Sequence, residues 1–326
     1  MKTALDRLEG VLQGRGVSRR TFLARCARAA AASSLALPAA RALAEPPEAG
    51  PREGAGAKGK HDLVVAKGSD PGAITRKAIE AMGGMRRFVK PGAVVVVKPN
   101  MAWDRVPEQA GNTNPAVMAA LVALCLEAGA KRVNVFDRPC NDRKRVYDRS
   151  GIKAAVEEKG AKVYFVDDWN AVKAKFASES PMAGWPLFRD AVECDTLINV
   201  PVLKHHDLTE LTLSMKNLMG VCLGDRGEIH GGIGAKLADL TAFLKPDLTV
   251  IDAFRVLTAH GPSGGDLKDV AARKTVIVGT DFVLADAFAA DFAGVSPANV
   301  PYIAEASTRG YGSADLKGAR IRSLGG

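Results

Sequence analysis

The stretch Ala93-Val94-Val95-Val96-Val97-Lys98-Pro99-Asn100 decides the fold of this chain. Its first five residues form an uninterrupted apolar run, mostly β-branched, which predicts a strand buried on both faces. Such strands belong to parallel sheets that helices cover on both sides. The run ends directly in a lysine, a proline and an asparagine, so polar groups stand where the strand ends.

Strand-length apolar runs alternate with helical patterns from residue 61 onward. We expect further strands at residues 63–66, 132–136, 162–166, 196–200, 248–251 and 275–278. We expect helices at about residues 71–82, 114–129, 152–159, 209–219, 237–244, 281–293 and 300–308. This alternation predicts a three-layer α/β fold, with a mostly parallel sheet and helices on both faces. A Gly-rich segment around residues 205–235 is expected to form a cap or lid.

The N-terminal residues have the pattern of a twin-arginine export signal. Ser18-Arg19-Arg20-Thr21-Phe22-Leu23 contains the paired arginines, a weakly apolar run covers residues 29–40, and Ala42-Leu43-Ala44 fits a cleavage site. The run is shorter than the roughly 20 apolar residues of a spanning helix, so we expect no stable membrane span after cleavage. The twin-arginine translocation machinery is therefore an expected partner, and the location is expected to be periplasmic or otherwise exported.

Three segments are predicted along the chain. Residues 1–44 are the signal peptide, residues 45–60 are a flexible linker rich in proline, glycine and charge, and residues 61–326 are one α/β domain. The signal segment holds eight Lys and Arg residues against two acidic ones, so residues 45–326 carry only +3 of the formal +9. That balance gives no support to nucleic-acid binding.

Four cysteines follow the signal segment: Cys125, Cys140, Cys194 and Cys222. None are spaced as CxxC, which excludes a ferredoxin-type iron–sulfur motif and a zinc ribbon. Cys125 falls in an apolar helical pattern and is expected in the core. Disulfide pairing among the other three stays open, since an exported protein meets an oxidising compartment.

Basic and amide side chains follow several of the predicted strands. Ligands of open parallel sheets bind outside the carboxyl ends of the strands, so these residues are the candidate site. Lysine and arginine side chains there suggest a pocket for a phosphate or carboxylate, and amides supply directional hydrogen bonds. The basic candidates are Lys98, Lys204, Lys216 and Arg226, and the amide candidates are Asn100, Asn199 and Asn217.

The histidines of the second half admit two interpretations. At most one of the adjacent His205 and His206 faces the pocket, because neighbouring residues of an extended segment point to opposite sides. As an acid or base, His205 or His230 acts with Asp252 orienting the ring. As metal ligands, His205, His230 and His260 form the candidate set, although no HExxH motif accompanies them.

These residues stand in motifs that resemble the domain-of-unknown-function family 362 (DUF362). The similarity runs from about residue 62 to 320 and rests on these stretches: Lys98-Pro99-Asn100, Thr113-Asn114-Pro115, residues 199–205 (NVPVLKH), residues 213–220 (LSMKNLMG), residues 245–252 (KPDLTVID), and Thr280-Asp281 with Asp286. Some members of that family carry a ferredoxin-like module, whose cysteine pattern this chain lacks. A more distant resemblance, in α/β architecture with Lys and His near strand ends, is to the catalytic domain of nickel-pincer lactate racemases.

The sequence thus favours an exported enzyme that acts on a small anionic molecule, with a bound metal or cofactor as an open option. Its expected catalytic residues are Lys98, Lys204, His205 and Asp252, and the expected ligand-binding residues are Asn100, Asn199, Lys216, Asn217 and Arg226. The alternative is a non-catalytic periplasmic carrier for an anion, a metal or a redox cofactor, which would use the same pocket.

Overall fold

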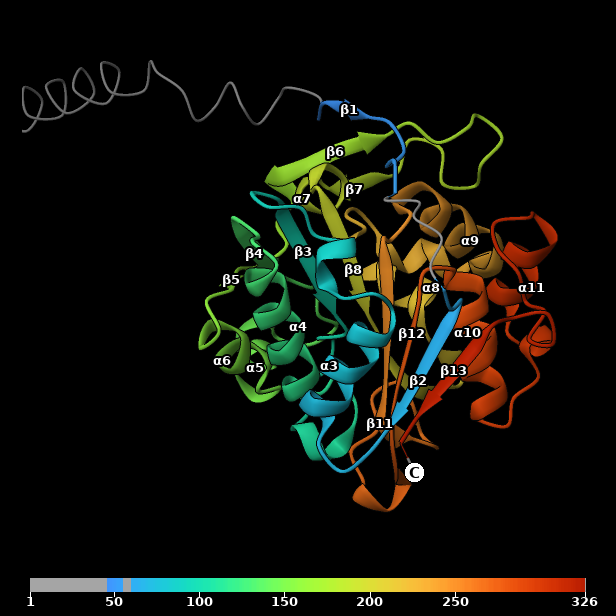
Figure 1. Ribbon diagram of the computed structural model, residues 1–326. Helices are drawn as coiled ribbons and strands as arrows, with labels where there is room; N and C mark the ends of the chain where they lie inside the picture. Colours follow the sequence, from blue (N-terminus) through green and yellow to red (C-terminus); the bar gives the residue numbers. More distant parts are fainter. Residues whose placement is uncertain (1–45, 55–59, 326) are drawn as a thin grey trace, which may run out of the picture. The chain divides into compact units, whose positions relative to one another are not determined.

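The computed structural model describes residues 46–54 and 60–325 (Figure 1). The predicted signal peptide, residues 1–44, lies outside the described residues. Within the described part of the chain, every helix is too short or too polar to cross a membrane.

A large sheet forms the middle layer of the domain. Along its main path, as far as the chain is described, the strand order is β13-β2-β12-β11-β8-β3-β4-β5, and in this path β12 alone runs antiparallel to its neighbours. The strands are β2 (Leu63–Lys67), β3 (Val94–Pro99), β4 (Arg132–Val135), β5 (Lys162–Val163), β8 (Thr196–Val200), β11 (Leu248–Leu257), β12 (Val270–Gly279) and β13 (Ile321–Leu324). The prediction of a mostly parallel sheet is therefore confirmed.

The apolar run at residues 93–97 forms most of β3, an interior strand of this sheet. Strand β3 pairs with β8 on one side and with β4 on the other, parallel to both. Val95, Val96 and Val97 are fully buried, as a strand between two helical layers requires. Lys98 continues the pairing opposite Asn199, which brings the two polar strand ends side by side.

Helices cover both faces of the sheet, each over its own hydrophobic core (Figure 1). One face carries α3 (Pro71–Ala81), α4 (Pro115–Glu127), α5 (Arg143–Arg149) and α6 (Ile152–Glu157). The other carries α7 (Arg189–Glu193), α8 (Ser214–Asn217), α9 (Ile233–Leu244), α10 (Phe282–Phe292) and α11 (Pro301–Thr308). Asp70 and Asn114 cap α3 and α4 with their side chains, each before a proline at the first helical position.

The predicted helix at residues 209–219 is wrong. Instead β9 (Val202–His206) and β10 (Glu210–Thr212) form an antiparallel hairpin, and only the short α8 and a 3-10 turn at Leu218–Val221 are helical. Apolar residues at helical spacing misled the prediction, because pairing with β9 outweighs local periodicity. The carboxylate of Asp286 fixes the start of α8 by accepting from the backbone N–H groups of Ser214 and Met215.

The Gly-rich segment divides into two parts. Residues 211–223 are all buried and belong to the core, whereas residues 224–232 lie largely at the surface, as do Asp207, Leu208 and Glu210 in the hairpin before them. Residues 224–232 include the 3-10 turn Arg226–His230. The cap is thus a short surface stretch that continues from buried chain.

The prediction of a flexible linker over residues 45–60 is also wrong for residues 46–54. Strand β1 (Glu48–Ala49) joins a small second sheet with β6 (Ala171–Ala174) and β7 (Pro186–Phe188). Arg52 is buried, pairs with Asp247 at 3.0 Å, and donates to the carbonyl oxygens of Leu244 and Cys194. A long-range partner, which local composition does not show, holds this segment on the domain.

Replacing Arg52 with methionine tests that attachment. The change leaves the buried Asp247 carboxylate without its guanidinium, and breaking such a pair costs about 3–5 kcal/mol. We expect urea unfolding to report a loss of that size. Arg86→Met, on the exposed surface, is the control and should shift the free energy of unfolding by less than about 0.5 kcal/mol. Equal losses in both variants would contradict the attachment.

Candidate active site

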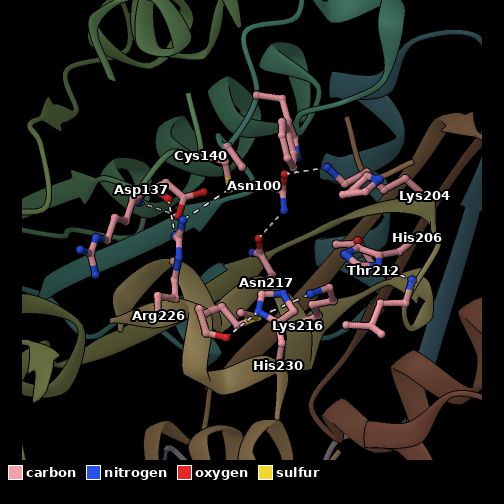
Figure 2. Close-up of a pocket in the computed structure, with 18 residues that line it drawn as sticks. Asn100, Asp137, Cys140, Lys204, His206, Thr212, Lys216, Asn217, Arg226 and His230 are labelled. Carbon is pink, nitrogen blue, oxygen red and sulfur yellow. Dashed lines mark hydrogen bonds between the residues drawn. The ribbon is translucent and has the colours of Figure 1, made fainter. Parts of the chain in front are cut away.

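A cavity of about 490 Å³ lies where the polar strand ends meet (Figure 2). Its wall is built from the segment after β3, the segment after β4, the β9–β10 hairpin, and the stretch from α8 to residue 230. This is the position in which an open parallel sheet binds its ligands. The polar side chains that line it are Asn100, Asp137, Arg138, Cys140, Lys204, His206, Thr212, Lys216, Asn217, Arg226 and His230.

The hairpin decides which of its side chains reach the cavity. Lys204 and His206 are two residues apart on β9 and share one face, and Thr212 lies directly opposite Lys204 on β10. His205 points to the other side, where its Nδ1 accepts from the N–H of Gly261 at 3.1 Å. The prediction that one of the two histidines faces the pocket is confirmed, but the choice of His205 is wrong.

Lys204 is buried in the cavity wall. Its Nζ donates to the carbonyl oxygen of Gly111 at 2.6 Å and to Oδ1 of Asn100 at 3.2 Å. Among the described residues no carboxylate lies within ion-pair distance of it. Burial, together with the positive charge of Lys216, lowers the pKa of Lys204 from its usual 10.5 to about 7. A substantial fraction of this amine is therefore neutral near neutral pH.

Lys98 lies behind the wall and forms a buried ion pair. Its Nζ contacts Oδ1 of Asp137 at 2.8 Å and also donates to the carbonyl oxygen of Pro99 and to Oδ1 of Asn217. Burial lowers the pKa of Lys98, and the carboxylate of Asp137 opposes that effect. All three ammonium protons have acceptors, so Lys98 is suited to hold the site together and does not itself face the cavity.

Two asparagines, Asn100 and Asn217, connect the two lysines, and a third supports them. Asn100 accepts from Lys204 and donates from Nδ2 to Oδ1 of Asn217 at 3.1 Å. Asn217 in turn donates to Oδ1 of Asn199 at 2.8 Å. Asn199 lies outside the cavity and anchors α8 by donating to the carbonyl oxygen of Ser214. Asn100 and Asn217 thus line the cavity as predicted, while Asn199 supports them from behind.

Lys216 and Arg226 bring two further positive charges to the cavity. Within the described chain the only hydrogen-bond partner of Lys216 Nζ is the thioether of Met219 at 3.5 Å. Burial lowers the pKa of Lys216 to about 8, and the charge of Arg226 contributes. Arg226 donates to the carbonyl oxygen of Arg138 at 2.6 Å and lies 3.4 Å from Sγ of Cys140. Neither cation has a carboxylate partner in the described part of the chain.

Three further lining residues, Asp137, Thr212 and His206, add no free negative charge to the cavity. Asp137 is the one acidic residue among those that line the cavity, and it is already paired with Lys98. The hydroxyl of Thr212 is buried and, among the described residues, lacks a hydrogen-bond partner. Burial and the charge of Lys216 lower the pKa of His206 to about 3, so its ring is neutral. The cavity is therefore positively charged and has an unused hydroxyl.

The structure does not bring the candidate metal ligands together. His230 is exposed beside the cavity, with Nδ1 3.0 Å from the carbonyl oxygen of Gly227. His260 is exposed and pairs with Asp269, away from the cavity. Across residues 46–54 and 60–325, no three His, Cys, Asp or Glu side chains converge as metal ligands would.

Asp252 has a structural position. Its buried carboxylate accepts from the backbone N–H groups of Asn114 and Phe254 at 2.7 and 3.0 Å. Burial raises its pKa to about 6. Among the described residues it forms no hydrogen bond or ion pair with a histidine, so the prediction that it orients a catalytic ring is wrong. The reason is that β11 continues to Leu257, which places Asp252 inside the strand.

Sequence reasoning left several lining residues unassigned: Trp103, Asp137, Arg138, Cys140 and Thr212. Asp137 and Arg138 lie shortly after the end of β4, where ligand-binding side chains are expected, but no specific role was assigned to them from the sequence. Trp103 and Thr212 carried no signal in the sequence. The cysteines at 125, 140, 194 and 222 are free thiols, and of these only Cys140 is exposed.

Comparisons with known proteins show what this chain is similar to. The chain is 28% identical over 243 residues to "Thylakoid-associated protein sll1697" of Synechocystis sp., covering 71% of this chain and 73% of that protein. A solved structure, the lactate racemase apoprotein from Thermoanaerobacterium thermosaccharolyticum, superposes with a TM-score of 0.43 at 12% identity. That superposition covers 73% of this chain and 57% of the racemase chain, little more than half its length. The model of the family described as "Domain of unknown function (DUF362)" matches residues 95–291, which include the cavity from Asn100 to Pro262, and the chain belongs to that family.

Proposed function

We propose that this protein is an enzyme that binds a small anionic molecule in the cavity and uses the amine of Lys204 to react with it. The observation that carries the proposal is the charge of the cavity. Among the described residues, Lys216 and Arg226 line it without a carboxylate partner, whereas its single acid, Asp137, is bound to Lys98. Cations that the fold keeps unneutralised in a concave site are suited to an anionic ligand.

Lys216, Arg226 and Thr212 supply the recognition of the anion. A guanidinium and an ammonium bind a carboxylate or phosphate through charge-assisted hydrogen bonds. The Thr212 hydroxyl, which is buried without a partner, offers a further donor. The neutral ring of His206 lies on the same face of β9 as Lys204.

Lys204 supplies the reactive group. Its neutral amine is a base and a nucleophile at a pH where an ordinary lysine is protonated, and such tuning by burial is characteristic of catalytic groups. The proposal assigns no metal or cofactor, since the candidate histidines point to different places. Export through the twin-arginine machinery is part of the proposal and rests on the pattern of residues 18–44.

Binding is tested by thermal shift with inorganic phosphate, pyruvate and glyoxylate at low salt. We expect at least one of these anions to raise the melting temperature. We expect Arg226→Gln and Lys216→Met each to lower the affinity for that anion by about 10- to 100-fold. The affinity should fall as salt rises, although the buried position of Lys216 limits the screening.

Arg86→Gln is the matched control, because it removes a positive charge from the exposed surface far from the lining residues. It should leave the anion affinity unchanged. Unaltered affinity in both pocket variants would contradict the proposed site. Binding with no conversion of any bound anion, together with a loss of affinity in Lys204→Met, would contradict the enzymatic part and leave a carrier.

A further inference from the structure

Resting on this proposed function, we propose that Lys204 forms an imine with a small anionic aldehyde or ketone, such as an α-oxo acid, whose acidic group lies on Lys216 and Arg226. The substrate class follows from two features of one cavity. The first is an amine held in a defined orientation, and the second is a pair of cations in the same cavity that have no carboxylate partner among the described residues.

The orientation of the amine comes from its two acceptors. A neutral lysine amine has two N–H bonds and one lone pair in a tetrahedral arrangement. The carbonyl oxygen of Gly111 and Oδ1 of Asn100 accept those two N–H bonds at 2.6 and 3.2 Å. Asn100 is itself fixed, because its Nδ2 donates to Asn217. The third corner, which carries the lone pair, is left for a ligand of the cavity that Lys204 lines (Figure 2).

The surroundings of Lys204 favour attack on a carbonyl carbon. Among the described residues no carboxylate within ion-pair distance holds the amine protonated, and the cations Lys98 and Lys216 disfavour its charged form. The ring centroid of Trp103 lies 5.9 Å from Nζ of Lys204, and the indole supplies an apolar wall beside the amine. A nucleophilic lysine desolvated next to other cations is an established way to prepare an amine for imine formation.

The other two lysines of the site do not meet these conditions. Lys98 donates all three protons of its ammonium group and pairs with Asp137 at 2.8 Å. Among the described residues, the only hydrogen-bond partner of the Lys216 ammonium is a thioether, and the positive charge of Arg226 acts on it. These two features suit Lys216 to hold an anion. Lys204 alone of the three combines access to the cavity with two oriented acceptors.

The step balances without a further reactant. The lone pair of Lys204 forms a bond to the carbonyl carbon, and the carbonyl oxygen gains a proton to give a carbinolamine. The hydroxyl then leaves as water, taking the second proton that the amine loses. The products are one imine and one water molecule, and no oxidant or reductant is consumed.

Borohydride trapping tests the inference. The wild-type protein is incubated with glyoxylate, reduced with sodium borohydride, and analysed by peptide mass spectrometry. We expect a carboxymethyl group on Lys204, added at least about 10-fold faster than on the exposed Lys131, since a neutral amine reacts and an ammonium does not. Acetaldehyde, which lacks the anionic group, should label Lys204 more slowly than glyoxylate does. Arg226→Gln should slow the labelling by glyoxylate more than it slows the labelling by acetaldehyde.

Two results would overturn it, and they are distinguishable. If glyoxylate raises the melting temperature but labels Lys204 no faster than Lys131, the imine is wrong and the anion pocket stands. If none of phosphate, pyruvate and glyoxylate binds and Lys204 is not labelled preferentially, the imine and the proposed function fail together.

Discussion

Lys204→Met is expected to abolish the reaction and to remove the loss of stability that the wild type shows as the pH falls from about 10.5 to about 7. The pKa of Lys204 is lowered to about 7 in the folded state and returns to its usual 10.5 on unfolding. Between these values the unfolded chain binds more protons, so wild-type stability rises with pH over that window. Below about pH 7 the full penalty of the buried charge is present, on the order of a few kcal/mol.

The methionine variant removes this penalty, but it also leaves the acceptors of Asn100 and Gly111 unpaired, which costs about 1–3 kcal/mol. The pH dependence therefore distinguishes the effects better than a single value does. The free energy of unfolding of Lys204→Met, measured by urea unfolding relative to wild type, should be highest near pH 6 and should fall toward pH 9. Asp286 titrates in both proteins, whereas Lys216 and His206 are electrostatically coupled to Lys204, so the difference between the two curves reports Lys204 together with its effect on these two neighbours.

The exposed Lys131→Met is the control for that comparison and should show no such slope. A stability difference between Lys204→Met and wild type that does not change with pH would contradict a neutral Lys204. Retained turnover in Lys204→Met would contradict its reactive role.

Asp137→Asn is expected to destabilise the protein by about 3–5 kcal/mol, because it leaves the ammonium of Lys98 buried without a counter-ion. The carboxylate also accepts from the backbone N–H groups of Met101 and Arg138, and it lies against Gly220. A Cβ on Gly220 would overlap that carboxylate and lie 2.6 Å from Nζ of Lys98. The ion pair and this glycine thus form one packed unit behind the cavity.

The double variant Lys98→Met/Asp137→Asn separates charge from packing. It removes both charges, so urea unfolding should find it more stable than Asp137→Asn alone. A loss below about 1 kcal/mol in Asp137→Asn, or a double variant no better than the single one, would contradict a buried ion pair at this position.

The sequence predicted the sheet and much of the cavity for one physical reason. A β-branched run such as Val94–Val97 must be buried on both faces, and the residues after its end must then lie at the ligand-binding edge. Lys204, Lys216, Asn217 and Arg226 follow from that rule together with the strand at Thr196–Val200. Their functional roles stay predictions.

What the sequence could not show depends on long-range partners. The alternation along β9 says that His205 and His206 face opposite ways, but only pairing with β10 and β11 decides which one reaches the cavity. Arg52 stands in a Pro- and Gly-rich segment and looks solvated until Asp247, far along the chain, is placed beside it. Asp252 was misassigned because the true length of β11 depends on its pairing with β12.

The crystal structure of the protein soaked with pyruvate, compared with unsoaked crystals, tests the central claim most directly. We expect new density for pyruvate in the cavity lined by Lys204 and Thr212, with its carboxylate in contact with Lys216 and Arg226. Pyruvate bound elsewhere on the protein, or an unoccupied cavity at a concentration that saturates the thermal shift, would contradict it.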